Sequence, residues 1–440
     1  MPEQTITSAK HIRRLRLARF CMVGAFVSVV FFLLTQDFRH SIVWQEQGLS
    51  TVDDIIAPAD QLQNSMLHRV VLAAIGLFAS LMLVRTRLPL HINGLLGCVL
   101  VFFVLWTILS AAWADDTAMA SRRLVAFVVV ALLALAVAGR FSTGELMALA
   151  FVLCGVILVE GVFAEVALGT LHFSQDAYRF CGTDDPNVGS WGIATLLLTA
   201  VAFASTSHRH RGLFWAAALV ALTFLLLGRT RTTTFAVTVA LFAYWYLISS
   251  RRRRLGITLA IVLAVLCISA VGYLVLDSAP LPVIRNAALL GRDPTDATTL
   301  SGRIPVWVEC MSYMRKRPLL GYGYGAFWTA QRVAEISSKA GWGNIAAASA
   351  MNSYIDLALS GGIIGAGALV LVFALAIVRA RLLFRITHNP SYAFACSFLL
   401  FICIVMLTEG ILSYPNISQF IALTILARLA LFPARLTASG

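Results

Sequence analysis

Long apolar runs, separated by short polar or basic segments, form the dominant pattern of this chain. A helix of about 20 apolar residues crosses the roughly 30 Å hydrocarbon core of a bilayer, and slightly shorter runs also suffice. Such runs cover residues 18–35, 70–84, 91–112, 124–139, 146–168, 190–206, 213–228, 234–249, 257–276, 353–378, 392–410 and 417–433. The pattern predicts an all-α integral membrane protein with about 12 transmembrane helices, in a single polytopic membrane domain over residues 1–440.

Composition agrees with this interpretation, because 59% of the 440 residues are hydrophobic and only 12% are charged. A soluble domain could not bury so much apolar surface, whereas a helical bundle in lipid exposes it without penalty. The first apolar run follows the basic stretch 10–19 and is long enough to remain a transmembrane helix. We therefore expect no cleavable signal peptide.

The basic residues predict the orientation in the membrane. If the N-terminus is cytoplasmic, the segments on that side hold more than half of the 34 Lys and Arg residues but only two acids, Glu3 and Glu145. Positive charge concentrates in the cytoplasmic loops of membrane proteins. Both termini are therefore expected to be cytoplasmic. The net charge of +13 follows from these loops, and we expect no nucleic-acid partner.

This topology leaves residues 277–350 as one long external loop between the ninth and tenth spans. The loop is too polar to cross the bilayer and too rich in patterned apolar residues to be only a linker. A short amphipathic helix along the membrane surface is predicted from the helical spacing of Val306, Trp307, Met311 and Met314. Ser301 would cap this helix and Pro318 would end it.

The glycine-rich stretch GYGYG follows at residues 321–325. It is weak evidence for phosphate binding, because no strand precedes it and no helix begins at the required place. We expect a flexible turn in which Tyr322 and Tyr324 face lipid or sugar. The preceding basic residues Arg315, Lys316 and Arg317 are expected to contact lipid headgroups.

Arginines at the outer membrane boundary are the first candidates for chemistry. Arg229 and Arg231 lie in GRTRTTT between two apolar runs, on the side where basic residues are not expected. They could snorkel to lipid headgroups, or they could form a cationic pocket for an anion. Arg179 and Arg303 lie in other external segments. Glu409 lies at membrane depth near the same side, where an arginine is its natural partner.

Further candidates lie where external segments meet the spans. In YRFCGTDDPNVGSW (178–191), Asp185 and Asn187 are expected to cap the following span. In ASAMNSYIDLALSGGIIGAG (348–367), Asn352, Tyr354 and Asp356 occupy the first turns of a span. The glycines that follow allow close helix packing.

The cysteines and histidines give no signal for a metal site. The eight cysteines are scattered, with no CxxC and no metal-ligand spacing, so we expect neither a metal ion nor any other cofactor. Only Cys181 and Cys310 lie in external segments, where an oxidising compartment would permit a disulfide between them.

Five stretches, in this order over residues about 170–415, resemble the O-antigen ligase/polymerase superfamily of bacterial polysaccharide assembly. They are the Gly–Thr…Pro–Asn loop at 182–187, TRTTTFAV at 230–237, SGRIPVW…RPLLGYGYGAFW at 301–328, MNSYIDLALSGGIIG at 351–365 and LTEGILSYPN at 407–416. The run YGYGAFW and the Thr–Glu–Gly near the end look closest to exopolysaccharide polymerases of the succinoglycan type.

The resemblance implies a metal-independent glycosyltransferase at the periplasmic face of the bacterial inner membrane. It would move a glycan from an undecaprenyl-diphosphate carrier to lipid A-core, as ligases do, or to another carrier-linked repeat unit, as polymerases do. Arg231 matches the family arginine at a span start, and Arg303 matches the arginine in the loop signature. Planar arginines suit a diphosphate leaving group, whose negative charge increases as the glycosidic bond breaks.

The resemblance also implies further contacts. Membrane lipids, a chain-length regulator and export proteins are the expected partners besides the glycan donor and acceptor. We expect substrate binding by Arg179, Arg229, Asn187, Trp307, Tyr322, Tyr324, Asn352 and Tyr354.

The chain departs from the ligases at Met351, where they carry a histidine. A thioether cannot accept a proton, so another group activates the acceptor or no base is needed. Glu409, Asp185 and Asp356 are the candidate bases, in falling order of preference. This departure favours a polymerase, with a ligase as the alternative.

Two other classes of protein remain. A flippase or transporter of lipid-linked oligosaccharide would also have about 12 spans and buried arginines. Transporters typically show internal repeats and broken helices near the membrane midplane. The chain has no evident repeat, and its charged candidates gather on one side. A structural or assembly subunit is the last alternative.

Overall fold

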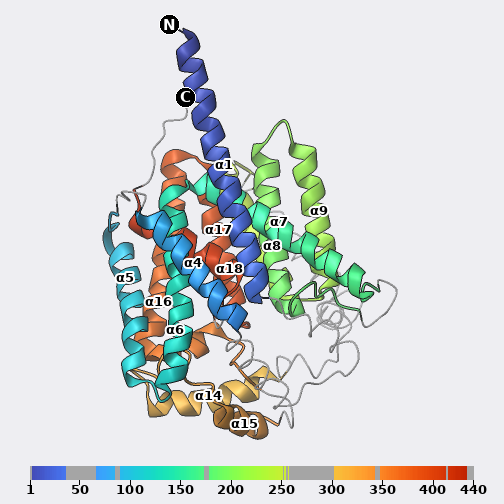
Figure 1. Ribbon diagram of the computed structural model, residues 1–440. Coiled ribbons are helices and arrows are strands. Elements are labelled where there is room, and N and C mark those ends of the chain that lie inside the picture. Colours follow the sequence, from blue (N-terminus) through green and yellow to red (C-terminus); the bar gives the residue numbers. More distant parts are fainter. Residues whose placement is uncertain are drawn as a thin grey trace.

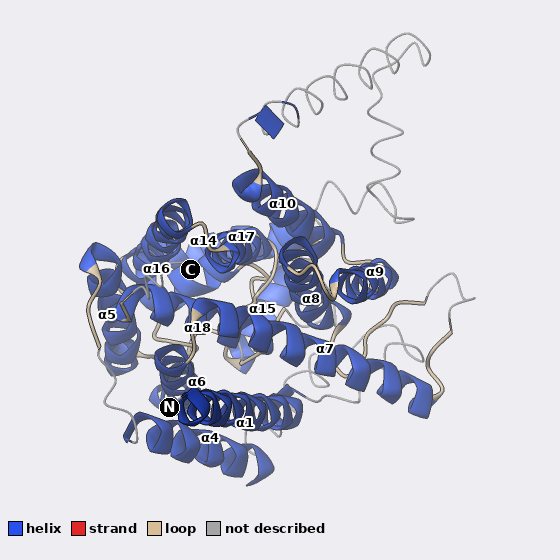
Figure 2. Ribbon diagram, turned by 90° about the horizontal axis from the view of Figure 1, so that it is seen from above, coloured by secondary structure: helices blue, strands red, loops and turns tan. Residues whose placement is uncertain are grey.

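The structure, a computed structural model, consists of helices and the turns that join them (Figure 1). It describes residues 2–35, 66–84, 90–172, 178–250, 252–253, 256, 302–341, 347–412 and 415–433. Within these ranges no strand occurs (Figure 2). Six of the described helices are long and apolar enough to cross a bilayer. The prediction of an all-α membrane protein is therefore confirmed.

The elements form a series of long apolar helices that two short helices, α14 and α15, interrupt. In chain order they are α1 (Pro2–Thr35), α4 (Met66–Val84), α5 (Gly94–Leu109), the 3-10 turn η1 (Ser110–Trp113), α6 (Thr117–Arg140), α7 (Thr143–Leu168), α8 (Pro186–Thr206), α9 (Arg211–Leu227), α10 (Arg231–Ile248), α14 (Arg303–Lys316), α15 (Ala330–Lys339), α16 (Ser353–Thr387), α17 (Pro390–Val405) and α18 (Ile417–Leu431).

Every predicted span except 257–276 coincides with one of these helices, and residues 257–276 lie outside the described ranges. The six helices with the length and hydropathy of a complete span are α4, α5 with η1, α6, α7, α8 and α16. The apolar stretches Leu17–Leu33, Arg211–Leu227, Pro390–Val405 and Ile417–Leu431 are shorter. The total of 12 spans stays a prediction.

Polar side chains fix where several helices begin. At α7, the Ser142 N–H donates to the Glu145 carboxylate, and the Ser142 hydroxyl accepts from the Glu145 N–H. Asp185 accepts the Asn187 N–H at 2.7 Å, with Pro186 as the first residue of α8. The predicted cap at Asp185 is therefore confirmed. These caps satisfy N–H groups that would otherwise lack a partner near lipid.

Helices α8 and α17 lie in the middle of the bundle. Helix α8 packs against α7, α9, α10 and α17, and α17 also packs against α10 and α16 (Figure 2). Of the α8 span 78% is buried, compared with 22% of the α4 span. Protein therefore encloses α8, whereas the described residues leave most of α4 uncovered.

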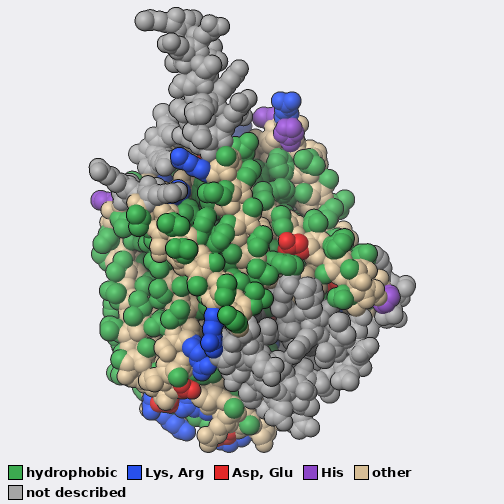
Figure 3. Space-filling view, in the orientation of Figure 1, with side chains coloured by type: hydrophobic (Ala, Val, Ile, Leu, Met, Phe, Trp, Pro, Cys, Tyr) green, Lys and Arg blue, Asp and Glu red, His purple; other side chains and the backbone are tan. Residues whose placement is uncertain are grey.

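Charged side chains gather mainly at the ends of the bundle. Hydrophobic side chains cover most of its visible flank, and many Lys, Arg, Asp and Glu side chains lie at the lower end (Figure 3). Helices α14 and α15 lie across this lower end, and α1 starts beyond the upper end (Figure 1). A hydrophobic flank between two charged ends is the surface expected of a bundle in a bilayer.

Residues 302–341, which we name the cap, form a small core of their own against α16. Its buried members are Val306, Cys310, Tyr313, Tyr322, Phe327 and Ile336, with Ala347, Ala350, Ile355 and Leu359 from the next segment. The predicted amphipathic helix appears as α14, which ends at Lys316, two residues before Pro318. The N-cap residue of α14 is Gly302, and no side chain accepts a hydrogen bond from the first turn of this helix among the described residues. Ser301, which was predicted as the N-cap residue, lies outside the described residues.

The stretch GYGYG packs tightly on α16. The Tyr322 N–H donates to Leu359 O at 2.7 Å, and the Gly323 N–H donates to Ser360 O at 2.9 Å. These carbonyls are accessible because α16 is interrupted at Gly362, where φ is 67°. A Cβ at Gly362 would overlap the Leu319 carbonyl, so only glycine fits there. The expected flexible turn is wrong, because backbone hydrogen bonds tie this segment to a helix.

The tyrosines of GYGYG pack within the protein. Tyr322 is 4% exposed. Its ring packs on Tyr313 and Phe327, and its hydroxyl donates to Tyr313 O at 3.0 Å. The Tyr324 ring lies 5.3 Å from that of Phe127 in α6. Tyr322 is therefore buried within the cap and does not face lipid, while its contact with sugar stays a prediction.

The cap is also bonded to the α5–α6 hairpin. Trp113 Nε1 donates to Leu320 O at 2.9 Å, and Arg123 Nη1 donates to Gly325 O at 2.6 Å. The carboxylate of Asp115, between η1 and α6, pairs with Arg317 at 2.6 Å and with Arg332 at 2.5 Å. Arg317, expected at lipid headgroups, instead joins the cap to the bundle.

Candidate active site

An arginine and an acid from the predicted set meet at the lower end of the bundle. Arg303 Nη2 lies 3.0 Å from Glu409 Oε1, and the two side chains are 14% and 11% exposed. Arg303 Nη1 also donates to Thr408 O. The first residue of α14 is thus bonded to the turn after α17. Glu409 was expected to pair with an arginine on this side, and Arg303 is that partner.

The start of α16 holds the turn that carries Glu409. Asn352 Nδ2 donates to Leu407 O at 2.8 Å, and Ser353 Oγ donates to Glu409 O at 2.8 Å. The Asn352 Oδ1 accepts the N–H groups of Tyr354 and Ile355 as the N-cap of α16. The position of the Glu409 carboxylate is therefore fixed by bonds from a long helix.

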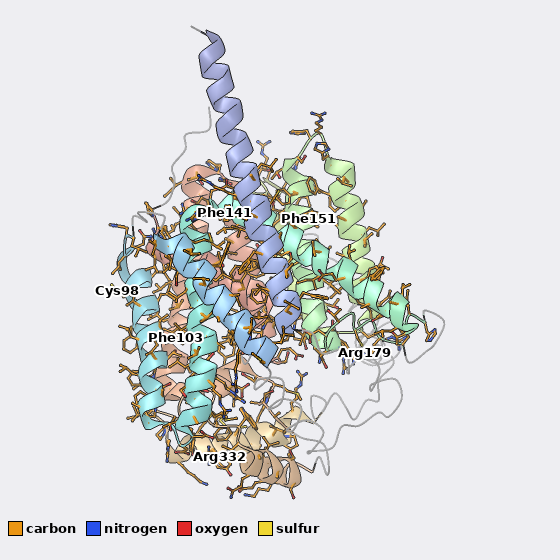
Figure 4. The ribbon with its side chains drawn as sticks, in the orientation of Figure 1. Cys98, Phe103, Phe141, Phe151, Arg179 and Arg332 are labelled. Carbon is orange, nitrogen blue, oxygen red and sulfur yellow. The ribbon has the colours of Figure 1, made fainter. Side chains whose placement is uncertain are left out.

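The segment between α7 and α8 brings Arg179 to the same end. Arg179 Nε donates to Gly228 O at 3.2 Å, and the Phe180 N–H donates to Leu227 O at 3.2 Å. Residues 178–185, which we name the α7–α8 loop, therefore rest on the turn between α9 and α10. Figure 4 shows Arg179 near the lower ends of α7 and α8, and Arg332 in the cap.

Three further charged groups lie close enough to Glu409 for their charges to act on its carboxylate. The charges of Arg179 and Asp185 both act on Glu409, in addition to that of Arg303. We name Arg179, Asp185, Arg303 and Glu409 the charged cluster. It contains two cations and two anions from four separate segments. The Arg303 and Glu409 side chains are largely buried, which strengthens the electrostatic interaction between them.

The turn between α9 and α10 places Arg231 as the first residue of α10. Arg229 precedes it with φ of 49°, a left-handed conformation that is uncommon outside glycine. Thr230 is the N-cap but makes no side-chain cap bond, and its Oγ1 is buried without a partner among the described residues. The positive end of the α10 dipole and Arg231 therefore both favour an anion here.

Other predicted site residues are engaged within the protein. Trp307 Nε1 donates to Ala350 O at 2.7 Å, and the Tyr354 hydroxyl donates to Cys403 O at 3.0 Å. Asp356 Oδ1 accepts from Trp328 Nε1 at 2.9 Å, which ties the cap to α16. Asn187 lies in the first turn of α8. Substrate contacts by these residues, and by Tyr322 and Tyr324, stay predictions.

Met351 directly precedes the N-cap of α16 and has φ of 47°. Its neighbour Asn352 bonds to the Glu409 turn. The position that carries a histidine in the ligases is therefore one residue from the support of the charged cluster. Among the three candidate bases, Asp185 is the N-cap residue of α8, and Asp356 accepts a hydrogen bond from Trp328 of the cap. Glu409 is the candidate whose known partner is a cation.

Sequence reasoning missed two acids that organise this end of the protein. Glu165 accepts three hydrogen bonds from the α7–α8 loop, and Asp115 binds two arginines of the cap. Glu165 had a signal, because an acid inside the apolar run 146–168 is as costly as Glu409. No sequence signal indicated Asp115, since acidic residues are common in short turns between helices.

Cysteine and metal chemistry find no support among the described residues. No group of three or more His, Cys, Asp or Glu side chains there could hold a metal ion. Cys181 and Cys310 are both free thiols, and Cys310 lies in the core of the cap. Burial, followed by the nearby Glu165 charge, raises the pKa of the Cys181 thiol to about 12. This thiol therefore stays protonated at neutral pH.

A cleft lies beside the α7–α8 loop, among α1, α7, α8 and α18. Much of its lining is apolar: Phe31, Ile157, Leu158, Phe180, Val188, Ile193 and Ile417. Gly161, Gly182 and Gly189 line it too, and Ser418 contributes a buried hydroxyl without a partner in the described ranges. Asp184 is the charged residue of the lining, and Arg179 precedes the lining residue Phe180 in the chain, so the cleft suits an apolar chain better than an anion.

Comparison with known proteins finds one family model that matches part of the chain. Residues 216–370 match the family model described as O-antigen ligase. The match includes most of α9, then α10, α14, α15 and the first half of α16, and thus Arg229, Arg231 and Arg303. It confirms the resemblance to the O-antigen ligase/polymerase superfamily, while the succinoglycan type stays a prediction. No curated protein matches the chain.

Proposed function

Because residues 216–370 carry an O-antigen ligase domain, we propose that this protein polymerises glycan repeat units linked to undecaprenyl diphosphate. It transfers the growing glycan from one carrier to the sugar of another carrier-linked unit, and so builds exopolysaccharide or O-antigen. The reaction takes place at the periplasmic face of the bacterial inner membrane and uses no metal ion.

The observation that carries this proposal is the contact between Arg303 and Glu409 inside the charged cluster. An arginine and a carboxylate, each less than 15% exposed, supply a diphosphate ligand and a proton acceptor at one place. Arg179 adds a second cation. Metal-independent glycosyl transfer from a diphosphate carrier needs these groups: cations for the leaving diphosphate and an acceptor for the hydroxyl proton.

The chemistry follows from these positions. The acceptor hydroxyl oxygen attacks the anomeric carbon of the donor sugar, and the bond from that carbon to the diphosphate oxygen breaks. The polyprenyl diphosphate leaves with the electron pair, and the guanidinium groups of Arg303 and Arg179 stabilise its increased charge. The proton of the hydroxyl passes to the Glu409 carboxylate.

Glu409 becomes an effective base when Arg303 no longer holds its carboxylate. A diphosphate carries more negative charge than one carboxylate and can accept two parallel N–H donors from a guanidinium. Donor binding therefore draws Arg303 away from Glu409. Loss of the neighbouring cation raises the proton affinity of the carboxylate at the moment when the acceptor must be deprotonated.

The start of α10 supports a second anion contact. Arg231 lies at the positive end of the α10 dipole, next to the Thr230 hydroxyl, which has no partner in the part of the chain that the structure describes. Helix α10 packs against α17, whose following turn carries Glu409. We assign Arg231 to one phosphate of the donor. Arg229 is exposed, so we assign it a contact with lipid headgroups in place of the donor.

The largely apolar cleft beside the α7–α8 loop supports a lipid-linked substrate, because its apolar lining suits part of a polyprenyl chain. In the proposed arrangement 12 spans cross the membrane, both termini are cytoplasmic, and the cap lies in the periplasm. A chain-length regulator and export proteins are the proposed protein partners.

A ligase with lipid A-core as acceptor is the second candidate, since the matched family model is that of the O-antigen ligases. Met351 in place of the ligase histidine favours the polymerase. A flippase is less well supported, because the charged cluster lies at one end of the bundle and does not mark a path along it.

A deletion strain tests the proposal. Single repeat units should accumulate on the carrier, and wild-type protein should restore long polymer. Polymer that forms but lacks a lipid A-core anchor would identify a ligase. Unchanged polymer length and anchoring in the deletion strain would overturn both assignments.

A further inference from the structure

Glu165, in the last turn of α7, holds the loop that carries Arg179. It is 2% exposed. One carboxylate oxygen accepts the N–H groups of Cys181 at 2.7 Å and Gly182 at 2.8 Å. The other accepts the Tyr178 hydroxyl at 2.5 Å. A buried carboxylate with three donors is a strong anchor, because charge-assisted hydrogen bonds are about twice as strong as neutral ones.

The backbones of α7 and the loop are also in direct contact. A Cβ at Gly161 would lie 3.0 Å from the Cα of Gly182, and Gly182 has φ of 68°. Side chains at either glycine would push the loop away from α7. The position of the loop is thus set by α7 through Glu165 and through this glycine contact.

Arg179 lies between the anchored residues. Tyr178 on one side and Cys181 and Gly182 on the other are bonded to Glu165. The Arg179 guanidinium extends to Gly228 O, and its charge acts on Glu409. Helix α7 therefore holds the α7–α8 loop in place, and this loop carries Arg179 of the charged cluster.

We infer that Glu165 is a positioning residue for glycosyl transfer, which fixes the α7–α8 loop so that Arg179 meets the donor diphosphate. This inference rests on the proposed function. Glu165 does not itself take a proton or touch substrate, because its oxygens are occupied by three donors of the loop. It acts through Arg179, since a cation displaced by about 1 Å stabilises the leaving group poorly.

Kinetics with purified protein in proteoliposomes and a lipid-linked donor test the inference. Glu165→Ala should raise KM for the donor at least about tenfold per folded molecule, because two loop N–H groups lose their acceptor. Glu165→Gln should recover most of this loss, since an amide oxygen accepts both N–H groups and its NH2 can donate to the Tyr178 oxygen. Failure of Glu165→Gln to recover activity would mean that the charge, and not the loop geometry, is required.

Glu160→Ala is the matched control. Glu160 is the same residue type on the same helix and is also partly buried. It makes no hydrogen bond to the described part of the α7–α8 loop. It should leave the donor KM unchanged, and an equal rise in KM for Glu160→Ala would overturn the inference by showing a general effect of altering α7.

A double variant distinguishes positioning from a general structural role. If Glu165 acts through Arg179, adding Glu165→Ala to Arg179→Ala should cause little further loss of activity per folded molecule. A loss in the double variant equal to the product of the two single losses would overturn the inference.

The Cys181 thiol gives a readout that does not depend on activity. It is partly buried in the anchored loop. Glu165→Ala should increase its modification by a maleimide at least about tenfold, measured on the Cys181 peptide by mass spectrometry, while Glu165→Gln should not. Wild-type labelling rates in Glu165→Ala would overturn the anchoring role and leave the proposed function intact. A wild-type protein without transferase activity would overturn the proposed function, and labelling would still decide whether Glu165 holds the loop.

Discussion

The pair formed by Arg303 and Glu409 makes the sharpest prediction, because it joins stability and activity in one contact. Arg303→Ala removes the cation and leaves a buried carboxylate, whereas Glu409→Ala leaves a buried guanidinium beside Thr408 O. Each single variant should therefore be destabilised. The double variant leaves neither charge uncompensated, so it should be destabilised by much less than the sum of the two single effects.

The magnitude follows from the burial of the pair. Side-chain exposures of 14% and 11% place it among buried ion pairs, for which loss of one partner costs about 3–5 kcal/mol. Because the double variant avoids the unpaired charge, we expect a coupling energy of about 2–3 kcal/mol. All three variants should lose polymer formation by at least about 100-fold, since in the proposed reaction Arg303 also binds the leaving group.

Thermal unfolding of the four proteins in one detergent measures the coupling, and polymer length in a deletion strain measures activity. The pair Glu335–Lys339 on α15 is the matched control, because its side chains are 39% and 52% exposed at a similar contact distance of 2.6 Å. Solvent screening should leave it without measurable coupling. Strictly additive effects of the Arg303 and Glu409 substitutions, or normal polymer from any of them, would refute the reasoning.

Four further predictions use other parts of the structure. Arg231→Ala should abolish polymer formation, and Arg231→Lys should also be poor, whereas Arg229→Ala should reduce polymer only mildly; polymer-length gels decide. Met351→Ala should be mild in the same assay, and a severe loss would reveal a role for this side chain. Gly362→Ala should lower Tm by several degrees because its Cβ overlaps the Leu319 carbonyl, whereas Gly367→Ala, with open space around its Cβ, should not. Burial raises the pKa of the Asp115 carboxyl, but hydrogen bonds and charges from Arg332 and Arg317 outweigh burial and lower this pKa below the usual 3.8. The contribution of Asp115 to folded-state stability should thus be complete above about pH 4 and should disappear as the pH falls through the lowered pKa. Asp115→Asn should remove this part of the pH dependence of Tm.

The helices of this fold could be predicted from the sequence because each one depends on a continuous run of apolar residues. An apolar run long enough to span lipid has to be a helix, since lipid offers no partner for its backbone groups. The caps were readable for the same reason. Asp185, Pro186 and Asn187 adjoin in the chain, so the cap of α8 needed no knowledge of the fold.

The candidate site was only partly predictable, because it depends on contacts between distant segments. Burial cost alone indicated that Glu409 needs a cation, but several external arginines could have supplied it. The choice of Arg303 depends on where α14 begins relative to the turn after α17. GYGYG was misjudged because its glycines meet the break in α16 at Gly362, a contact that no local pattern encodes.

The origin of the charged cluster also explains how such charges are tolerated at the boundary of a membrane protein. Arg179 lies in a loop, Asp185 caps a helix, Arg303 begins a helix and Glu409 lies in a turn. Each position provides free N–H or C=O groups that the middle of a transmembrane helix lacks. A substrate path through the bundle would need charges along helix interiors, where such partners are absent. A transferase whose two lipid-linked substrates present their sugars at the same face needs them only at one end. In the proposed reaction, the ion pair of Arg303 with Glu409 then keeps the cluster stable until the donor diphosphate takes the place of the carboxylate.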